Sequence, residues 1–286
     1  MLAKIKQLFY TSRPISWVNT AFPFAAGYYM VTSRVDMTLF IGTLFFLIPY
    51  NLLMYGVNDV FDYESDILNP RKGGIEGAKL AKSTHPFILI CSFGIVIPFI
   101  IFLLSKSNQN GKIILLFVVF AVLAYSLPKL RFKERAFLDS ITSSTHFVGP
   151  LVYALTFGSF TNNSILIIIS FFLWGMASHA LGAVQDITPD KAAGIGSVAT
   201  VLGARQTVRL SGLLYAISAL LLIFLGWKGL IAAASISLYI LNIRSYFNIL
   251  EKDAEKINIA WKRFIKLNAF TGFIVTMLLI YSVALQ

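Results

Sequence analysis

Carboxylates gather in this sequence at two places where apolar segments end. The first group has the pattern N-D-x-x-D-x-x-x-D and consists of Asn58, Asp59, Asp62 and Asp66. If one helix continues through these residues, all four lie within about a quarter of its circumference, because successive residues are rotated by about 100°. Glu64 lies on the opposite side of that helix and is not counted with them. We therefore expect one acidic face at this helix end.

The second group has the pattern D-x-x-x-D and consists of Asp186 and Asp190. Residues four apart share a helix face. Pro189 is expected to kink or restart the helix here, with Thr188 as the N-cap, because proline does not continue a helical hydrogen-bond ladder. Either arrangement leaves both carboxylates near one helix end.

The two groups together predict a site for Mg²⁺ and a diphosphate. Carboxylates on one face repel one another, which is costly at a membrane interface unless cations compensate, and Mg²⁺ favours carboxylate oxygens together with substrate phosphates. Two acidic groups that face each other would make a bound diphosphate a leaving group, with Asp62 and Asp186 as catalytic carboxylates. Its departure from an allylic carbon would leave an allylic cation. The alternative is a solvated acidic collar, salt-bridged to Arg71, Lys72 and Lys79.

The elements that must position these groups are membrane-spanning helices. The chain has 286 residues, 57% of them hydrophobic, and a mean hydropathy of +0.75, whereas a soluble domain is about 45–50% apolar. Nine apolar segments are long enough to cross a hydrocarbon core, at about 15–33, 37–57, 85–104, 112–127, 137–157, 164–184, 209–226, 229–246 and 263–284. We predict an all-α, polytopic membrane protein in which nine transmembrane helices surround a central cavity. No linker divides the chain, so a single domain over residues 1–286 is expected.

The distribution of charge predicts how these helices are oriented. With the N-terminus inside, the cytoplasmic segments carry 20 Lys and Arg residues and the opposite loops carry 4, as expected because cytoplasmic loops are enriched in these residues. The formal charge of +11 therefore reflects topology, and no nucleic-acid partner is expected. We predict a multi-pass protein of the cell membrane with a cytoplasmic N-terminus. Both acidic groups fall in the long inside connections 58–84 and 185–208, so the active site is expected to face the cytoplasm.

Basic residues near the acidic groups are candidates for binding diphosphate oxygens, because Lys and Arg form charge-assisted hydrogen bonds with phosphates. These candidates are Arg71, Lys72, Lys129, Arg131 and Lys191. The alternative is that they serve topology alone, since positive charge is needed in these loops whatever the substrate.

The paired motifs in a nine-span context resemble the UbiA superfamily of intramembrane prenyltransferases. The first acidic group matches every specified position of that family's first aspartate-rich motif, and the second group matches the other. Tyr125 and Lys129, in "YSLPKLRFKE", resemble its third conserved element. The resemblance implies Mg²⁺-dependent transfer of a prenyl group from an allylic diphosphate to a hydrophobic acceptor in the membrane lipid. It also implies that Asn58 is a metal ligand beside the aspartates and that Asn58 and Tyr125 contact the diphosphate.

Three further stretches resemble the carotenoid branch of that family, the lycopene elongases. Many members follow the first motif with Arg-Pro-Leu-x-x-Gly, whereas this chain has "NPRKGGIEGAKL". The resemblance lies in that variant and in two later stretches, "LDSITSSTHFVGP" (138–150) and "HALGAVQDITPDKAAGIGSVATVLGAR" (179–205). It implies addition of a C5 unit from dimethylallyl diphosphate to the end of lycopene, in some members with hydration.

After an alkene attacks an allylic cation, a tertiary cation remains that must lose a proton or take up water. His146 and His179 are candidate bases for this step, and His179 lies seven residues before Asp186, on roughly the same helix face. The alternative is that each imidazole bonds to a neighbouring helix.

Two other functions remain open at this point, and a third is excluded. The acceptor could be an aromatic quinone precursor or a lipid instead of a carotenoid. An ion-coupled secondary transporter would also use intramembrane acids, although transporters place them near the bilayer midplane and here they lie at helix ends. A CDP-alcohol phosphotransferase is excluded, because its D-G-x-x-A-R signature is absent from the sequence.

Overall fold

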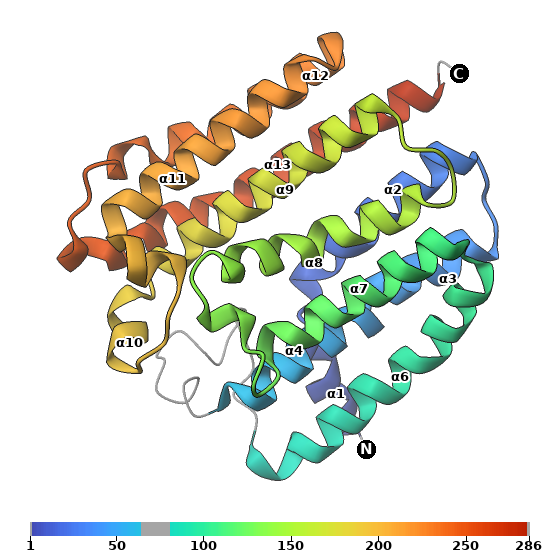
Figure 1. Cartoon of the computed structure of the whole chain (residues 1–286), viewed down its shortest axis with the longest axis horizontal. Helices are drawn as coiled ribbons and strands as arrows, with labels where there is room; N and C mark the ends of the chain where they lie inside the picture. The colour runs from blue at the N-terminus through green and yellow to red at the C-terminus, as the bar shows by residue number, and fades with distance from the viewer. Residues whose placement is uncertain (1, 64–80, 285–286) are drawn as a thin grey trace. The chain divides into compact units, whose positions relative to one another are not determined.

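The computed structural model describes residues 2–63 and 81–284, and within them it contains helices and no strand. Short 3₁₀ helices occupy Pro14–Ser16, Lys82–Thr84, Phe132–Glu134, Arg244–Tyr246 and Glu251–Lys256. The α-helices (Figure 1) are α1 (Leu2–Thr11), α2 (Trp17–Thr32), α3 (Met37–Leu47), α4 (Pro49–Phe61), α6 (His85–Lys106), α7 (Gln109–Ser126), α8 (Leu138–Leu155), α9 (Asn162–Val184), α10 (Ile187–Ala192), α11 (Val198–Ile223), α12 (Gly226–Ile243) and α13 (Ile257–Ala284). The all-α prediction is confirmed.

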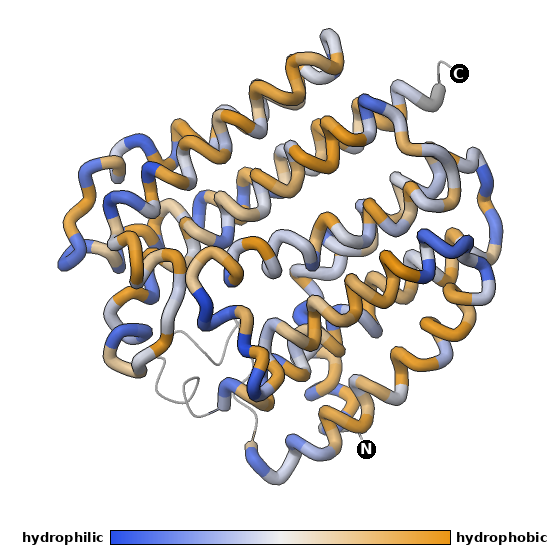
Figure 2. The backbone as a smooth tube through the Cα atoms, in the orientation of Figure 1, coloured by the Kyte–Doolittle hydropathy of each residue, from blue (hydrophilic) through white to orange (hydrophobic). Residues whose placement is uncertain are grey.

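The long helices have the length and composition of membrane spans. Within the described ranges, seven segments are long and apolar enough to cross a membrane, and α3 with α4 counts as one of them. Figure 2 shows apolar stretches along these helices, with hydrophilic residues mainly near their ends. Helices α2 and α8 occupy the two other predicted positions, but α2 has only 16 residues and α8 begins with the polar run "LDSITSST". The predicted count of nine is therefore approximate.

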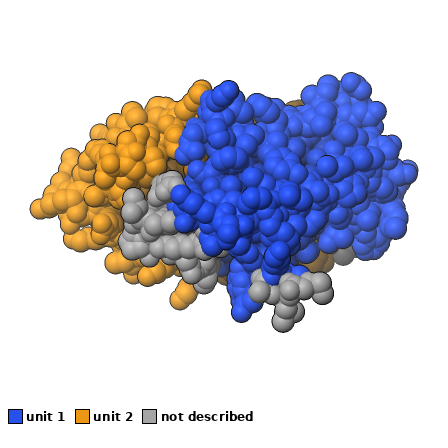
Figure 3. Space-filling view, turned by 90° about the horizontal axis from the view of Figure 1, so that it is seen from below, with its two compact units in different colours: residues 1–132, 145–159 blue, residues 133–144, 160–286 orange. Residues whose placement is uncertain are grey.

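The chain divides into two compact units, coloured separately in Figure 3. Unit 1 comprises residues 1–132 and 145–159, and unit 2 comprises residues 133–144 and 160–286. Helix α8 contributes its first residues to unit 2 and the rest to unit 1. The single domain over residues 1–286 stays a prediction.

Unit 1 is built around a cluster of aromatic side chains. Phe24 of α2, Phe46 of α3, Tyr50 of α4 and Tyr153 of α8 are all fully buried, and the ring centroid of Phe24 lies 5.1 Å from that of Phe46 and 5.8 Å from that of Tyr153. A Cβ atom at Gly42 of α3 would overlap the Phe24 ring. The absence of a side chain at Gly42 therefore allows α3 to approach α2 closely.

Unit 2 is a bundle in which α9 packs along α11, α11 along α12, and α12 along α13. Its core combines aromatic rings with polar pairs between helices. The Oγ atoms of Ser170 in α9 and Ser218 in α11 are 2.9 Å apart, and the Ser178 hydroxyl lies 3.0 Å from the Tyr215 hydroxyl. Small hydroxyl residues of this kind let membrane helices approach and bond to one another.

Two helix ends differ from the sequence-based expectation. Helix α4 ends at Phe61, with Asp62 as its C-cap, so it does not continue unbroken through residue 66. Helix α9 ends at Val184, and α10 begins with Asp186 at the N-cap, so the prediction of Thr188 as N-cap is wrong. The backbone N–H of Asp190 donates to the Asp186 carbonyl at 2.9 Å, and Pro189 then lies in the first turn, where a missing N–H costs no helical hydrogen bond.

Candidate functional site

Asn58 connects the end of α4 to the end of α7 in unit 1. Its Nδ2 donates to Oδ2 of Asp62 at 2.5 Å and to Oγ of Ser126 at 3.0 Å. Both hydrogens of the amide nitrogen are used in this way, so Oδ1 is the atom of Asn58 that is suited to a cation. The Asp62 residue itself is buried, with 6% of its surface exposed.

Arg131 brings positive charge to the same helix end. Its Nη2 lies 3.7 Å from Oδ1 of Asp62, and its Nη1 donates to the carbonyl of Phe61 at 3.4 Å. Lys129 and Arg131 have positive φ angles of 73° and 39°. These left-handed residues turn the chain after α7 back towards the end of α4, so the structure brings Asn58, Asp62 and Arg131 together while the Lys129 side chain is exposed.

Asp59 has a different environment from Asp62. Its carboxylate is fully buried, and Nη2 of Arg13 donates to its Oδ1 at 2.7 Å. The Arg13 guanidinium also lies over the ring of Tyr55, 4.1 Å from the centroid, and the Tyr55 hydroxyl donates to Oγ of Ser16 at 3.0 Å. This set connects α4 to the segment between α1 and α2.

Three residues of this site were not predicted from the sequence, namely Arg13, Tyr55 and Ser126. Arg13 is 46 residues from Asp59 and was counted only for topology, and Ser126 is 68 residues from Asn58. Tyr55 lies four residues before Asp59, and residues at this spacing share a helix face. This spacing was the one local indication that Tyr55 lies near the acidic group.

His146 and Tyr125 lie together in unit 1. The ring centroid of Tyr125 is 5.1 Å from that of His146, in an edge-to-face arrangement, and Nε2 of the buried His146 lies 3.3 Å from the carbonyl oxygen of Ala121. A carbonyl only accepts, so Nε2 must carry a hydrogen in this contact. The imidazole thus bonds to the backbone of the neighbouring helix α7.

In unit 2, Asp186 and Asp190 lie within one helical turn, both half-buried. Nζ of Lys191 is 2.5 Å from Oε1 of Glu251, and both side chains are about half exposed, at 48% and 51%. His179 of α9 has its Nδ1 3.1 Å from Oγ of Ser140. Lys191 and His179 therefore have partners that the spacing of the motifs did not indicate.

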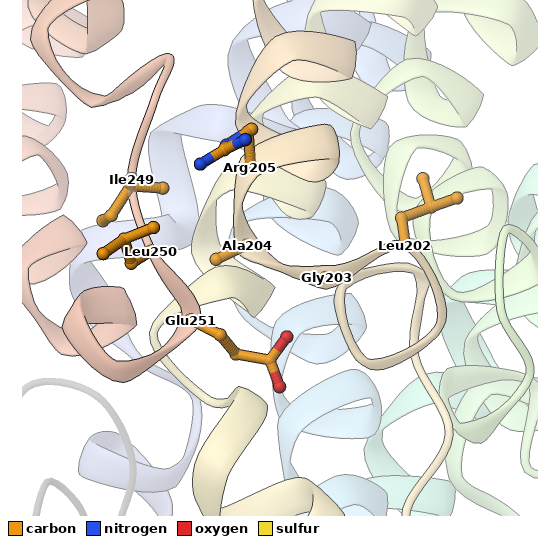
Figure 4. Close-up of a pocket in the computed structure, with 7 residues that line it drawn as sticks. All are labelled: Leu202, Gly203, Ala204, Arg205, Ile249, Leu250 and Glu251. Atoms are coloured by element: carbon orange, nitrogen blue, oxygen red, sulfur yellow. The ribbon is translucent and has the colours of Figure 1, made fainter.

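A shallow pocket of about 230 Å³ has Glu251, the partner of Lys191, in its wall, and Figure 4 shows the residues that line it. Its lining residues are Leu202, Gly203, Ala204, Arg205, Ile249, Leu250 and Glu251. Gly203 has φ 76° and ψ 164°, which interrupts the helical conformation inside α11. Such angles are essentially restricted to glycine, so this residue is required where α11 bends along the pocket wall.

The donor atoms of the described acidic residues suit Mg²⁺, which prefers carboxylate and carbonyl oxygens and retains places for water and phosphate. Within the described residues, 2–63 and 81–284, no group of three or more His, Cys, Asp or Glu side chains forms a metal site by itself. Substrate phosphate oxygens would complete such a coordination shell. Asp66, Arg71 and Lys72 lie outside the described residues.

Comparison with known proteins shows the family of the chain. The UbiA prenyltransferase family model matches residues 20–280. A lycopene elongase/hydratase of Corynebacterium glutamicum is 48% identical over 282 residues, covering 98% of each chain. The C(50) beta-cyclic carotenoids biosynthesis protein LbtBC of Dietzia sp. is 46% identical over 279 residues, which are 96% of this chain and 65% of that protein.

Solved structures share the fold. A UbiA homologue from Archaeoglobus fulgidus has a TM-score of 0.71 at 18% identity, covering 96% of this chain and 97% of the other. The structure of a UbiA homologue from the same organism bound to DMAPP and Mg²⁺ has a TM-score of 0.67 at 18% identity, covering 92% and 98%. Family, relatives and fold agree that this chain is a membrane prenyltransferase and belongs to the UbiA prenyltransferase family.

Proposed function

We propose that the protein uses Mg²⁺ to transfer a prenyl group from dimethylallyl diphosphate to an end of lycopene. The observation that carries the chemistry is the assembly of Asn58, Asp62 and Arg131 at the end of α4. The acceptor is supported by the full-length similarity to lycopene elongase/hydratases. An aromatic quinone precursor or a lipid is the alternative acceptor, and the family is one of enzymes, which argues against a transporter.

The proposed metal ligands are the carboxylates of both acidic groups and the amide oxygen of Asn58. They are Asn58, Asp59, Asp62, Asp66, Asp186 and Asp190. When bound, Mg²⁺ would neutralise diphosphate charge and so make it a better leaving group. Asn58 holds Asp62 through a hydrogen bond to Oδ2, and Oδ1 of Asp62 lies 3.7 Å from Nη2 of Arg131.

Basic residues are proposed to bind the diphosphate oxygens. Arg131 is the best placed of the described candidates, because its side chain is 30% exposed while Nη2 lies 3.7 Å from Oδ1 of Asp62. A planar guanidinium can bond two oxygens at once. Tyr125, Lys129 and Lys191 are proposed further contacts, and Arg71 and Lys72 complete the set from outside the described residues.

We further propose that the N-terminus and the active site face the cytoplasm. The 20 to 4 distribution of Lys and Arg supports this orientation. The carotenoid would enter from the membrane lipid, because it is too apolar to be supplied through water.

The function is tested by expression in lycopene-producing cells, followed by mass spectrometry of the pigments. Wild-type protein should add the mass of one or two C5 units, and Asp62→Ala, inserted at equal level, should add none. In isolated membranes, chelation should stop the reaction and Mg²⁺ should restore it. Unaltered lycopene beside expressed wild-type protein would contradict the carotenoid acceptor, and full activity of Asp62→Ala would contradict the metal role.

A further inference from the structure

Asp139, Ser140 and His179 form a chain of polar side chains within unit 2. Asp139 and Ser140 stand at the start of α8, and His179 lies on α9. Oγ of Ser140 is 3.4 Å from Oδ1 of Asp139 and 3.1 Å from Nδ1 of His179. The serine hydroxyl therefore stands between a carboxylate and an imidazole.

The carboxylate of Asp139 is held on both of its oxygens. Oδ1 accepts from the backbone N–H of Ser140 at 2.7 Å, and Oδ2 accepts from the backbone N–H of Val198, the first residue of α11, at 2.9 Å. Asp139 is fully buried and Ser140 is 3% exposed. These contacts fix the position of the carboxylate and, through it, that of the serine.

This arrangement selects one tautomer of His179. The carboxylate accepts only, so the Ser140 hydroxyl donates to it and its oxygen is left to accept from Nδ1–H of His179. Nε2 is then the basic nitrogen of the ring.

The residues of this hydrogen-bonded network come from the two described stretches of sequence that resemble lycopene elongases. Asp139 and Ser140 belong to 138–150, and His179 and Val198 belong to 179–205. No step of metal or diphosphate binding uses Asp139 or Ser140. Their chemistry fits the later step, in which the tertiary cation is quenched.

We propose that Asp139 and Ser140 are positioning residues that hold His179 as the base for hydration of the product cation. The proposal rests on the proposed prenyl transfer. The oxygen of a water molecule forms a bond to the cationic carbon, one O–H bond of that water breaks, and the proton moves to Nε2 of His179. The proton then passes to the released diphosphate, so no oxidant or reductant is needed. Without His179, the cation loses a C–H proton to the released diphosphate and yields an alkene.

The test compares Ser140→Ala with Ser144→Ala in lycopene-producing cells. Ser144 is a matched control, because it is buried on the same helix and donates to the Phe172 carbonyl of α9 at 2.7 Å, with no imidazole involved. The measured quantity is the ratio of hydrated to unhydrated C5 additions, determined by mass spectrometry with ¹⁸O-labelled water. Loss of one orienting hydrogen bond should lower this ratio by about three- to tenfold, and Ser144→Ala should leave it unchanged.

Two further variants keep the proposal falsifiable. His179→Gln should lower the ratio by about a hundredfold, as expected for loss of a base, while prenylation continues, and Ser140→Thr, which keeps the hydroxyl, should restore the wild-type ratio. An unchanged ratio in both Ser140→Ala and His179→Gln would overturn the proposal. So would a loss of all prenylation in Ser140→Ala but not in Ser144→Ala, because the network would then act before the cation forms. If wild-type protein adds no C5 unit, the proposed function itself fails.

Discussion

Replacement of Arg13 tests whether the buried ion pair with Asp59 holds the end of α4. The Arg13 side chain is 15% exposed and that of Asp59 is fully buried, with 2.7 Å between Nη2 and Oδ1. Arg13→Ala removes this charge-assisted bond and also the guanidinium that lies over Tyr55. Both losses act on a residue that joins the segment before α2 to Asp59 of the first acidic group.

The expected cost follows from this burial. Removing one partner of a buried ion pair costs about 3–5 kcal/mol, and the low end applies because Arg13 keeps some contact with solvent. The cation–π contact adds about 0.5–1 kcal/mol. Arg13→Ala should therefore lower the free energy of unfolding by about 3–4 kcal/mol. Arg13→Lys should cost about 1 kcal/mol, because it keeps the charge and loses the planar fork.

The assay is equilibrium unfolding in mixed micelles with a double-mutant cycle of Arg13→Ala and Asp59→Asn. We expect a coupling energy of about 2 kcal/mol, since the two side chains are in direct contact. Tyr55→Phe is the matched control, because it retains the ring below Arg13 and removes only the hydrogen bond to Ser16. A coupling energy below about 0.5 kcal/mol, typical of an exposed pair, would refute the reasoning.

The remaining predictions concern catalysis, packing and a helix cap. Asp62→Ala and Asp186→Ala should each lower turnover by at least about a thousandfold. The double variant should be little slower than the slower single variant, because the effects of residues that act as a unit are not additive. If the two effects multiply in the kinetic assay, the two residues have independent roles. Gly42→Ala should destabilise the protein by about 1–3 kcal/mol through overpacking, whereas Gly94→Ala, which would place its methyl group in open space, should be neutral or slightly stabilising in the same unfolding assay. Burial alone raises the pKa of Asp36, but hydrogen bonds from Leu39, Tyr28 and Thr38 hold that pKa below its ordinary value of 3.8. Asp36→Asn should therefore weaken the N-cap of α3 and lower the free energy of unfolding by up to about 1 kcal/mol at neutral pH. This difference in stability between variant and wild type should shrink as the pH falls through the lowered pKa. A difference in stability that grows on acidification would contradict this.

Much of the fold was predictable because apolar segments of membrane length leave little choice of structure. The bilayer requires helices, so the segments at 85–104 and 164–184 were found close to their observed bounds. Helix ends were less predictable. Phe61 ends α4 and Asp186 is the N-cap of α10 because of local backbone hydrogen bonds, and the sequence pattern contains no direct measure of these.

The candidate site was predictable where its residues share a helix turn and not where distant segments meet. Asn58 and Asp62 are four residues apart, and their hydrogen bond follows the helical period. Asp59 belongs to the same motif, yet its carboxylate points to Arg13, 46 residues away. Only packing determines such a contact, because sequence spacing carries no information about which loop covers a helix face.

The interruption of α11 at Gly203 separates two parts of that helix that make different contacts. Before it, a short capped turn presents the N–H of Val198 to Asp139. After it, Arg209 anchors the long membrane portion to the carbonyl of Phe247 and the side chain of Asn248. A non-glycine residue at 203 would be strained by about 1–3 kcal/mol in these angles. If it adopted helical angles instead, one continuous helix would have to make both sets of contacts. Gly203 thus allows the long part of α11 to follow a direction of its own while the capped turn before it keeps its hydrogen bond to Asp139.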